Sequence, residues 1–142
     1  MAEPHWIVDG ENRISLRIQG DTIYAISYGQ VTYPMLVDYL RIIDQETGAN
    51  RRTLYFVTSV QQNNGTLDVS GRRYLAKWSA QNRIGGLAVV GANWLVRSLT
   101  VLIFNGASLI NRNAIPIAFF QSEEQAIPWI DSLRRKNADK DK

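Results

Sequence analysis

Alternating hydrophobic and polar residues near the start of the chain predict β-strands. Within residues 14–18 every second side chain is apolar, a period of two that is typical of a strand with one face in water. A short apolar run at residues 6–8 precedes this segment, and Gly20-Asp21 separates it from a β-rich run at 22–28. A Gly-Asp pair between two such runs indicates a hairpin. We therefore expect the chain to open with three strands.

The pattern then changes from the period of a strand to that of a helix. Thr32 is a suitable N-cap, and Pro34 stands in the first turn, where its missing N–H costs nothing. Apolar residues then recur every three or four positions until Gly48, which is a typical stop signal. Nearly continuous apolar runs at 53–57 and 87–90 are typical of central strands that are covered on both faces.

The second half of the chain alternates between helices and strands. The complete order is β-β-β-α-β-α-β-α-β-α, which predicts the α/β class, with one mixed sheet flanked by about four helices. Pro128 lies inside the final helical pattern and predicts a bend or a later start there, because an interior proline breaks a hydrogen bond. The other expected elements are a polar loop at 60–67, a helix from about Asp68 or Ser70 to Asn82, a helix from Trp94 to about Ile110 capped by Asn93, a strand at 115–120, and a final helix opened by the capping box Ser122 to Gln125. Pro116 suggests that the strand at 115–120 lies at an edge of the sheet, or that the proline stands at the entry of the strand.

Length and charge refine this outline. A chain of 142 residues is the size of one domain, which we expect at 1–135, followed by a polar, disordered tail at 136–142. The net charge of +3 comes from residues 134–142, which hold five basic and two acidic side chains, whereas residues 1–133 hold 11 of each. We see no basic stripe with interleaved aromatic residues in the body, and therefore expect no nucleic-acid binding.

The composition narrows the chemistry further. The chain has no cysteine and one histidine, His5, which excludes disulfides, thiolate sites and multi-histidine metal sites and leaves no convincing base for a serine triad. No glycine spacing matches a phosphate loop. We expect no enzyme activity, no cofactor and no metal.

The longest apolar stretch, 94–110, contains Arg97 and is shorter than the ~20 residues that span a bilayer. Since no secretory signal opens the sequence, we expect a cytoplasmic protein without a transmembrane segment.

Three groups of segments carry a family resemblance. They are Asp68-Val69-Ser70-Gly71-Arg72-Arg73-Tyr74-Leu75-Ala76-Lys77-Trp78, Leu87-Ala88-Val89-Val90-Gly91-Ala92 followed by Arg97, and Pro116 to Phe120 with Glu123 to Ala126 and Trp129-Ile130. These segments resemble the STAS domain, the fold of anti-sigma factor antagonists, and most of all a bacterial STAS-like group of unknown activity that is related to lipid-binding CRAL-TRIO domains. The resemblance covers about residues 14–135. It implies a non-enzymatic regulatory or protein-interaction module in signalling.

The start of the second expected helix is the candidate interaction site. In anti-sigma factor antagonists an Asp-Ser-Ser-Gly segment opens this helix, and a partner kinase phosphorylates the serine before the glycine. Asp68, Ser70 and Gly71 match that segment, and Val69 does not. The resemblance therefore implies Ser70 as a phosphoacceptor, and Arg72 and Arg73 add charge beside it. The alternative is that this serine only caps the helix.

The third expected helix is apolar almost all round, so more than one of its sides must be covered. We expect these sides to be buried by a second subunit, by a bound apolar ligand, or by the N-terminal segment around Trp6. We favour a homodimer contact, with Trp94, Leu95 and Phe104 on the surface in question. The alternative function is a carrier or sensor of a hydrophobic, lipid-like molecule held near these residues.

Overall fold

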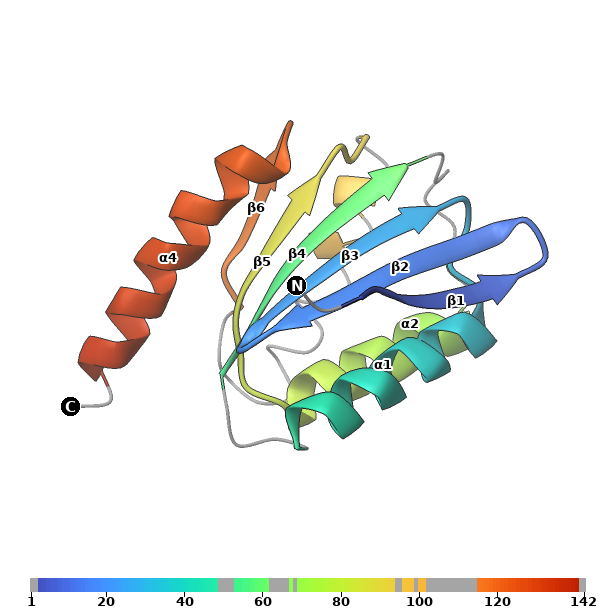
Figure 1. The fold of residues 1–142 in the computed structure, drawn as a ribbon, viewed down its shortest axis with the longest axis horizontal. Helices are drawn as coiled ribbons and strands as arrows, with labels where there is room; N and C mark the ends of the chain where they lie inside the picture. Colours follow the sequence, from blue (N-terminus) through green and yellow to red (C-terminus); the bar gives the residue numbers. More distant parts are fainter. Residues whose placement is uncertain are drawn as a thin grey trace.

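The structure is a computed structural model that describes residues 3–48, 53–61, 67, 69–93, 96–98, 100–101 and 115–140. Residues 139 and 140 are described by their backbone. It confirms the α/β class and the mixed sheet expected from the sequence (Figure 1). Residues 96–98 and 100–101 are also helical. The strands and longer helices are β1 (His5–Asp9), β2 (Asn12–Gln19), β3 (Thr22–Tyr28), α1 (Tyr33–Thr47), β4 (Leu54–Gln61), α2 (Val69–Gln81), β5 (Ile84–Val90), β6 (Ile117–Phe120) and α4 (Glu123–Lys140).

The sheet has six strands in the order β1-β2-β3-β4-β5-β6, so each strand lies beside the one that precedes it in the sequence. The pairs β1–β2 and β2–β3 are antiparallel, and the pairs from β3 to β6 are parallel. Helices α1 and α2 lie side by side on one face of the sheet, and α4 packs on the other face against β4, β5 and β6 (Figure 1). Right-handed crossovers that always step in one direction place α1 and α2 on the same face.

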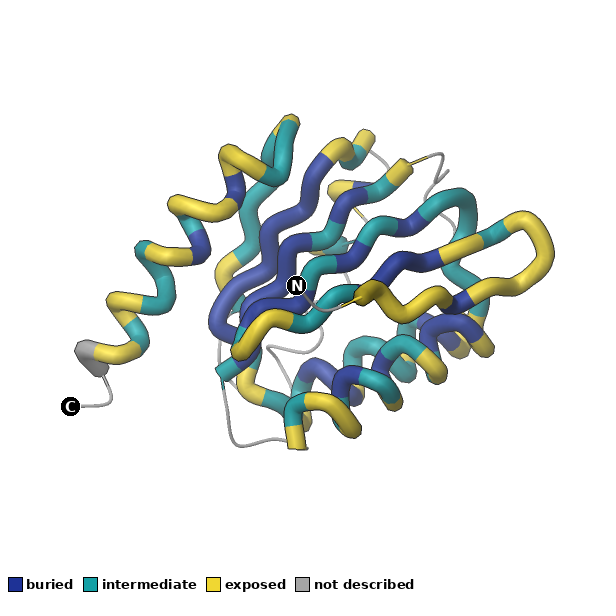
Figure 2. The backbone as a smooth tube through the Cα atoms, viewed as in Figure 1, coloured by how far each residue is buried: buried dark blue, intermediate teal, exposed yellow. Residues whose placement is uncertain are grey.

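The core has a layer on each face of the sheet, and β4 contributes to both. Leu54 and Phe56 pack with α1 and α2, whereas Tyr55 and Val57 pack with α4. This is the alternation expected of a pleated strand that is covered twice. Figure 2 shows β4 and β5 buried along most of their length, while β1 at the edge is mostly exposed.

The boundaries of α1 and its contact with α2 follow from local chemistry. The Thr32 hydroxyl accepts from the backbone N–H of Met35 at 3.4 Å, and Gly48 ends the helix with a left-handed φ of 72°. Both were expected from the sequence. On α2, the indole N–H of Trp78 donates to the Asp44 carboxylate of α1 at 3.1 Å. The Trp78 ring also meets Phe56 edge to face, with 6.1 Å between centroids. Trp78 therefore fixes α2 to both α1 and the sheet.

The C-terminal ends of β4 and α4 differ from the sequence-based expectation, and β5 begins at Ile84, three residues earlier than the expected strand at 87–90. Strand β4 continues to Gln61, although we expected a polar loop from residue 60, because Val60 packs against the core and the Gln61 carbonyl accepts from Gly29 N–H at 2.9 Å. Helix α4 continues to Lys140, although we expected a polar tail from residue 136, because Asn137 Nδ2 donates to the Tyr55 hydroxyl at 2.9 Å. A side chain that is hydrogen-bonded to the sheet belongs to the fold.

The two helix starts in the last third of the chain agree with their predicted caps. Asn93 Oδ1 accepts from Val96 N–H at 2.9 Å, so a helix begins where expected, although most of the expected 94–110 helix lies outside the described residues. At α4, the Ser122 hydroxyl accepts from Gln125 N–H at 3.3 Å. The helix then runs through Pro128, starting at Glu123 rather than nearer Gln125.

Candidate functional site

The start of α2 is the surface that the sequence singles out, and the structure leaves it open to solvent. The helix begins at Val69, so Ser70 is its second residue and its side chain is exposed. The position before the helix, where a capping side chain would stand, belongs to Asp68, which lies outside the described residues. Ser70 thus combines exposure with a place in the first turn, where backbone N–H groups lack partners within the helix.

The two arginines that follow have different surroundings. Arg72 is half-buried and its Nε donates to the Leu67 carbonyl at 2.7 Å, so it ties the first turn of α2 to the preceding segment. Arg73 is exposed and lies three residues after Ser70, hence on the same side of the helix. Lys77, seven residues after Ser70, is also exposed on that side. We call Ser70, Arg73 and Lys77 the Ser70 surface.

The structure therefore divides the predicted site. It brings Arg73 next to Ser70 along the helix and gives Arg72 a structural contact instead. Lys77 was missed by the sequence analysis, although the spacing of three and then four residues after Ser70 is a helical signal that finds it. Within the described ranges, neither Arg73 nor Lys77 forms an ion pair, so both charges face solvent.

The apolar surface expected on the third helix lies mostly outside the described residues. Trp94, Leu95 and Phe104 lie outside the described residues. Of the neighbouring residues that are described, Val96 is buried and Val101 is exposed. The homodimer and the hydrophobic-ligand site at these residues therefore stay predictions.

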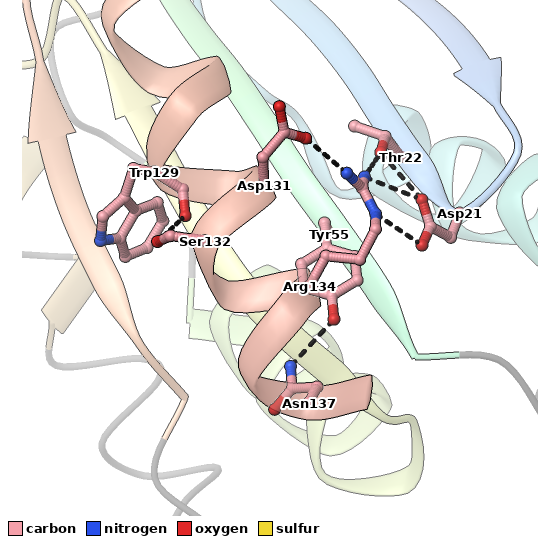
Figure 3. Close-up of polar contacts among 8 residues, drawn as sticks. All are labelled: Asp21, Thr22, Tyr55, Trp129, Asp131, Ser132, Arg134 and Asn137. Atoms are coloured by element: carbon pink, nitrogen blue, oxygen red, sulfur yellow. Dashed lines mark hydrogen bonds and ion pairs between the residues drawn. The ribbon is translucent and has the colours of Figure 1, made fainter. Parts of the chain in front are cut away.

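A polar cluster beneath α4, which the sequence analysis did not foresee, is organised by Arg134 (Figure 3). Its Nε and one Nη donate to the two carboxylate oxygens of Asp21 at 3.1 and 3.0 Å, and the same Nη donates to the Thr22 hydroxyl at 2.6 Å. The other Nη reaches Asp131 at 2.6 Å, and the guanidinium lies 5.1 Å from the centre of the Tyr55 ring. We call these five residues, with Asn137, the Arg134 cluster.

The Arg134 cluster corrects the charge analysis of the sequence. Arg134 was counted with the basic tail, but it forms ion pairs with two carboxylates and fixes α4 to the start of β3. Hydrogen bonding to Asp21 is the main cause that raises the pKa of the Arg134 guanidinium above its ordinary value. Because both acids are already bound to this one base, the cluster holds α4 in place and offers no free acid–base pair.

A second grouping, on the exposed face of the first three strands, also went unnoticed in the sequence. The rings of Trp6 and Tyr28 stack with 6.4 Å between centroids and 27° between planes. The Arg13 guanidinium lies 5.8 Å from the Trp6 ring centre and 5.3 Å from that of Tyr28. These residues come from three different strands, so no local sequence motif records them, and only the strand register places them together.

The described part of the chain shows neither a group of metal ligands nor a membrane-spanning helix. Within the described ranges, no group of three or more His, Asp and Glu side chains is arranged to hold a metal ion. Among the helices of the same part of the chain, none has the length and apolar character required to cross a bilayer.

Comparison with known proteins adds the identity of the fold. The sequence matches no known family model and no curated protein. The structure matches the crystal structure of an uncharacterised protein of the DUF3478 family from Shewanella loihica, which is described as having a SpoIIAA-like fold. The TM-score is 0.57 at 12% sequence identity, and the match covers 91% of this chain and 98% of that chain. The chain has a SpoIIAA-like fold.

The SpoIIAA-like match confirms the STAS-like resemblance drawn from the sequence at the level of fold. A shared fold at this identity says nothing about shared chemistry.

Proposed function

We propose that this SpoIIAA-like domain is a non-enzymatic regulatory or protein-interaction module, and that the Ser70 surface is its contact face. The observation that carries the proposal is the exposure of Ser70 in the first turn of α2, with Arg73 and Lys77 further along the same side, neither of which forms an ion pair with a described residue. Phosphorylation of Ser70 would change the charge of this face and thereby select between partners.

The local chemistry suits a phosphate at Ser70. A phosphoserine carries about −1.5 to −2 charges at pH 7. At the second residue of a helix it lies at the positive end of the helix dipole, which is worth about 0.3–1 kcal/mol for an anion. Arg73 at the i+3 position adds about 0.2–0.5 kcal/mol. Phosphorylation is therefore compatible with an intact α2 and alters the surface rather than the fold.

The direct test uses the full chain purified from its own host under phosphatase inhibition. Tandem mass spectrometry should find phosphate on Ser70, in a fraction that varies with growth phase. A synthetic phosphopeptide spanning Ser70 is the positive control for detection. If that standard is detected while Ser70 is unmodified in every growth phase, the phosphorylation part of the proposal is wrong.

The interaction part is tested by comparing charge variants in the host. Ser70→Asp introduces a negative charge on the contact face, and Gln45→Glu introduces one on the exposed side of α1 as a matched control. A protein cross-linked to the wild-type chain should be lost from Ser70→Asp and retained by Gln45→Glu. Equal cross-linking of both variants would place the partner elsewhere on the domain.

A further inference from the structure

A group of exposed aromatic and aliphatic side chains lies on the sheet face opposite α1, over β1, β2 and β3. Ile7 points into the core, so its neighbours Trp6 and Val8 point the other way, and they are exposed at 52% and 61%. The register pairs Val8 with Arg13 and Arg13 with Tyr28, which makes these side chains neighbours across three strands. We call Trp6, Val8, Arg13 and Tyr28 the Trp6 patch.

The Trp6 patch lies outside the part of this face that α4 covers. Helix α4 packs against β4, β5 and β6 (Figure 1). Its first residue, Glu123, reaches β2, where its Oε1 lies 3.5 Å from Nη2 of Arg17. Figure 2 shows that β1 and the turn after it remain exposed. An exposed tryptophan beside an exposed valine forms contiguous apolar surface, and such surface on a protein often marks a site of interaction.

The aromatic side chains and the arginine of the patch already contact one another without a partner. The Trp6 ring stacks on Tyr28, and the Arg13 guanidinium lies over both rings. Side chains that are fixed before binding lose little conformational entropy when a partner arrives. Trp, Tyr and Arg are also the residues that most often dominate binding energy at protein interfaces.

Charge indicates which partner fits. Within the described residues Arg13 forms no ion pair with an acid, whereas the neighbouring Arg17 is paired with Glu123. A partner carboxylate next to Arg13 would therefore gain an unshared positive charge that is flanked by apolar surface. We propose that the Trp6 patch is a docking surface for an acidic protein segment whose apolar side chains cover Trp6 and Val8.

Two other occupants fit less well. A two-fold contact between copies of this chain would place the patch against itself and bring one Arg13 towards the other, which charge repulsion disfavours. Single-stranded nucleic acid needs several cations along its backbone, and among the described residues of β1, β2 and β3 only Arg13 is a cation without an acidic partner. The proposal does not depend on the Ser70 surface, because α2 lies on the opposite face of the sheet.

The test selects random peptides displayed on phage against the immobilised full chain, and measures the affinity of the selected peptides by fluorescence anisotropy. Selected peptides should be rich in Asp or Glu together with Leu, Phe, Tyr or Trp. Arg13→Glu should weaken their binding by about tenfold or more, the loss typical of a removed hot-spot contact. The matched control Arg41→Glu, on the exposed side of α1, should leave binding unchanged.

A charge exchange separates a direct contact from a folding effect. Peptides in which the acidic residues are replaced by lysine should bind Arg13→Glu and not the wild type, and this recovery requires a folded variant. Trp6→Ala should also lose binding while it keeps the wild-type circular dichroism spectrum.

Four results would overturn the proposal. They are the absence of enriched peptides, enrichment without acidic bias, equal binding by Arg13→Glu, and no recovery with the lysine peptides. Arg13-dependent binding of a single-stranded oligonucleotide would instead indicate a nucleic-acid surface. A wild-type dimer in analytical ultracentrifugation that Trp6→Ala dissociates would assign the patch to a second copy.

Discussion

The Arg134 cluster allows a quantitative test of what holds α4 on the sheet. The perturbation is a double-mutant cycle with Arg134→Met, which keeps the aliphatic length, and Asp21→Asn, which keeps the planar shape of the carboxylate and removes its charge. The two side chains are 37% and 31% exposed and share two charge-assisted hydrogen bonds. An exposed ion pair contributes about 0.2–1 kcal/mol, and the bidentate geometry places this one at the upper end. We expect a coupling free energy of about 1 kcal/mol.

The single substitution Arg134→Met should cost more than the coupling alone. It also removes the hydrogen bond to the Thr22 hydroxyl, the contact with Asp131 and the cation–π contact with Tyr55. These add about 0.3 kcal/mol for the pair within the helix and about 0.5–1 kcal/mol for the cation–π contact, so the total is at least about 2 kcal/mol before the hydrogen bond to Thr22 is counted. Arg135→Met, one residue further along α4 and exposed, should cost less than about 0.5 kcal/mol.

Urea unfolding at neutral pH measures all four members of the cycle. The measurement is repeated in about 1 M NaCl, where the Debye length falls to about 3 Å and the coupling should shrink. A coupling below about 0.2 kcal/mol, or an equal loss for the Arg134 and Arg135 variants, would refute the reasoning, because it would mean that the observed geometry adds nothing beyond the exposed helix surface.

The other predictions concern α2, α4 and a buried tyrosine. Ser122→Ala should lower the free energy of unfolding by about 1 kcal/mol because it removes the cap of α4, whereas Ser70→Ala should change it by less than about 0.5 kcal/mol; an equal loss at both would favour the purely capping role of Ser70. Trp78→Phe should lower the free energy of unfolding in urea by about 2 kcal/mol, because it replaces a buried indole by a smaller ring and removes the hydrogen bond to Asp44. A loss near zero would contradict the anchoring role of Trp78. Burial raises the pKa of the Tyr39 hydroxyl, so the folded state keeps a proton that the unfolded chain releases near pH 10. Stability should therefore fall as the pH rises above about 10, and Tyr39→Phe should flatten that fall; identical alkaline profiles would exclude Tyr39 as its source.

Local patterns were sufficient to predict most of the architecture. The alternation at 14–18, the Thr32 cap and the Asn93 cap each depend on residues close together in the sequence, and each is present in the structure. The end of β4 was predicted less well, because Val60 belongs to the strand only through its packing against the core. Polar residues that follow it made the whole segment read as a loop.

Contacts between distant residues could not be predicted in this way. Arg134 and Asp21 are separated by 113 positions, so an arginine near the end of the chain looked like part of a basic tail. Trp6, Arg13 and Tyr28 are brought together by strand register, which a single sequence does not specify. The Ser70 surface is intermediate, since helical spacing indicates Arg73 and Lys77, while only the structure separates Arg72 from them by giving it a backbone partner.

The strand order has a consequence for the way in which the chain folds. Because each strand pairs with the one before it, the sheet can grow in the order of synthesis, from the β1–β3 meander to β6, with no strand inserted between two earlier ones. Such a topology keeps each loop closure shorter than it would be if a later strand were inserted between two earlier ones. Helix α4 is the exception, since it follows all six strands in the sequence and contacts residues of the first half of the chain through Arg134 and Asn137. Until residues 123–140 are in place, the α4-facing side of β4 and β5 is left exposed to solvent.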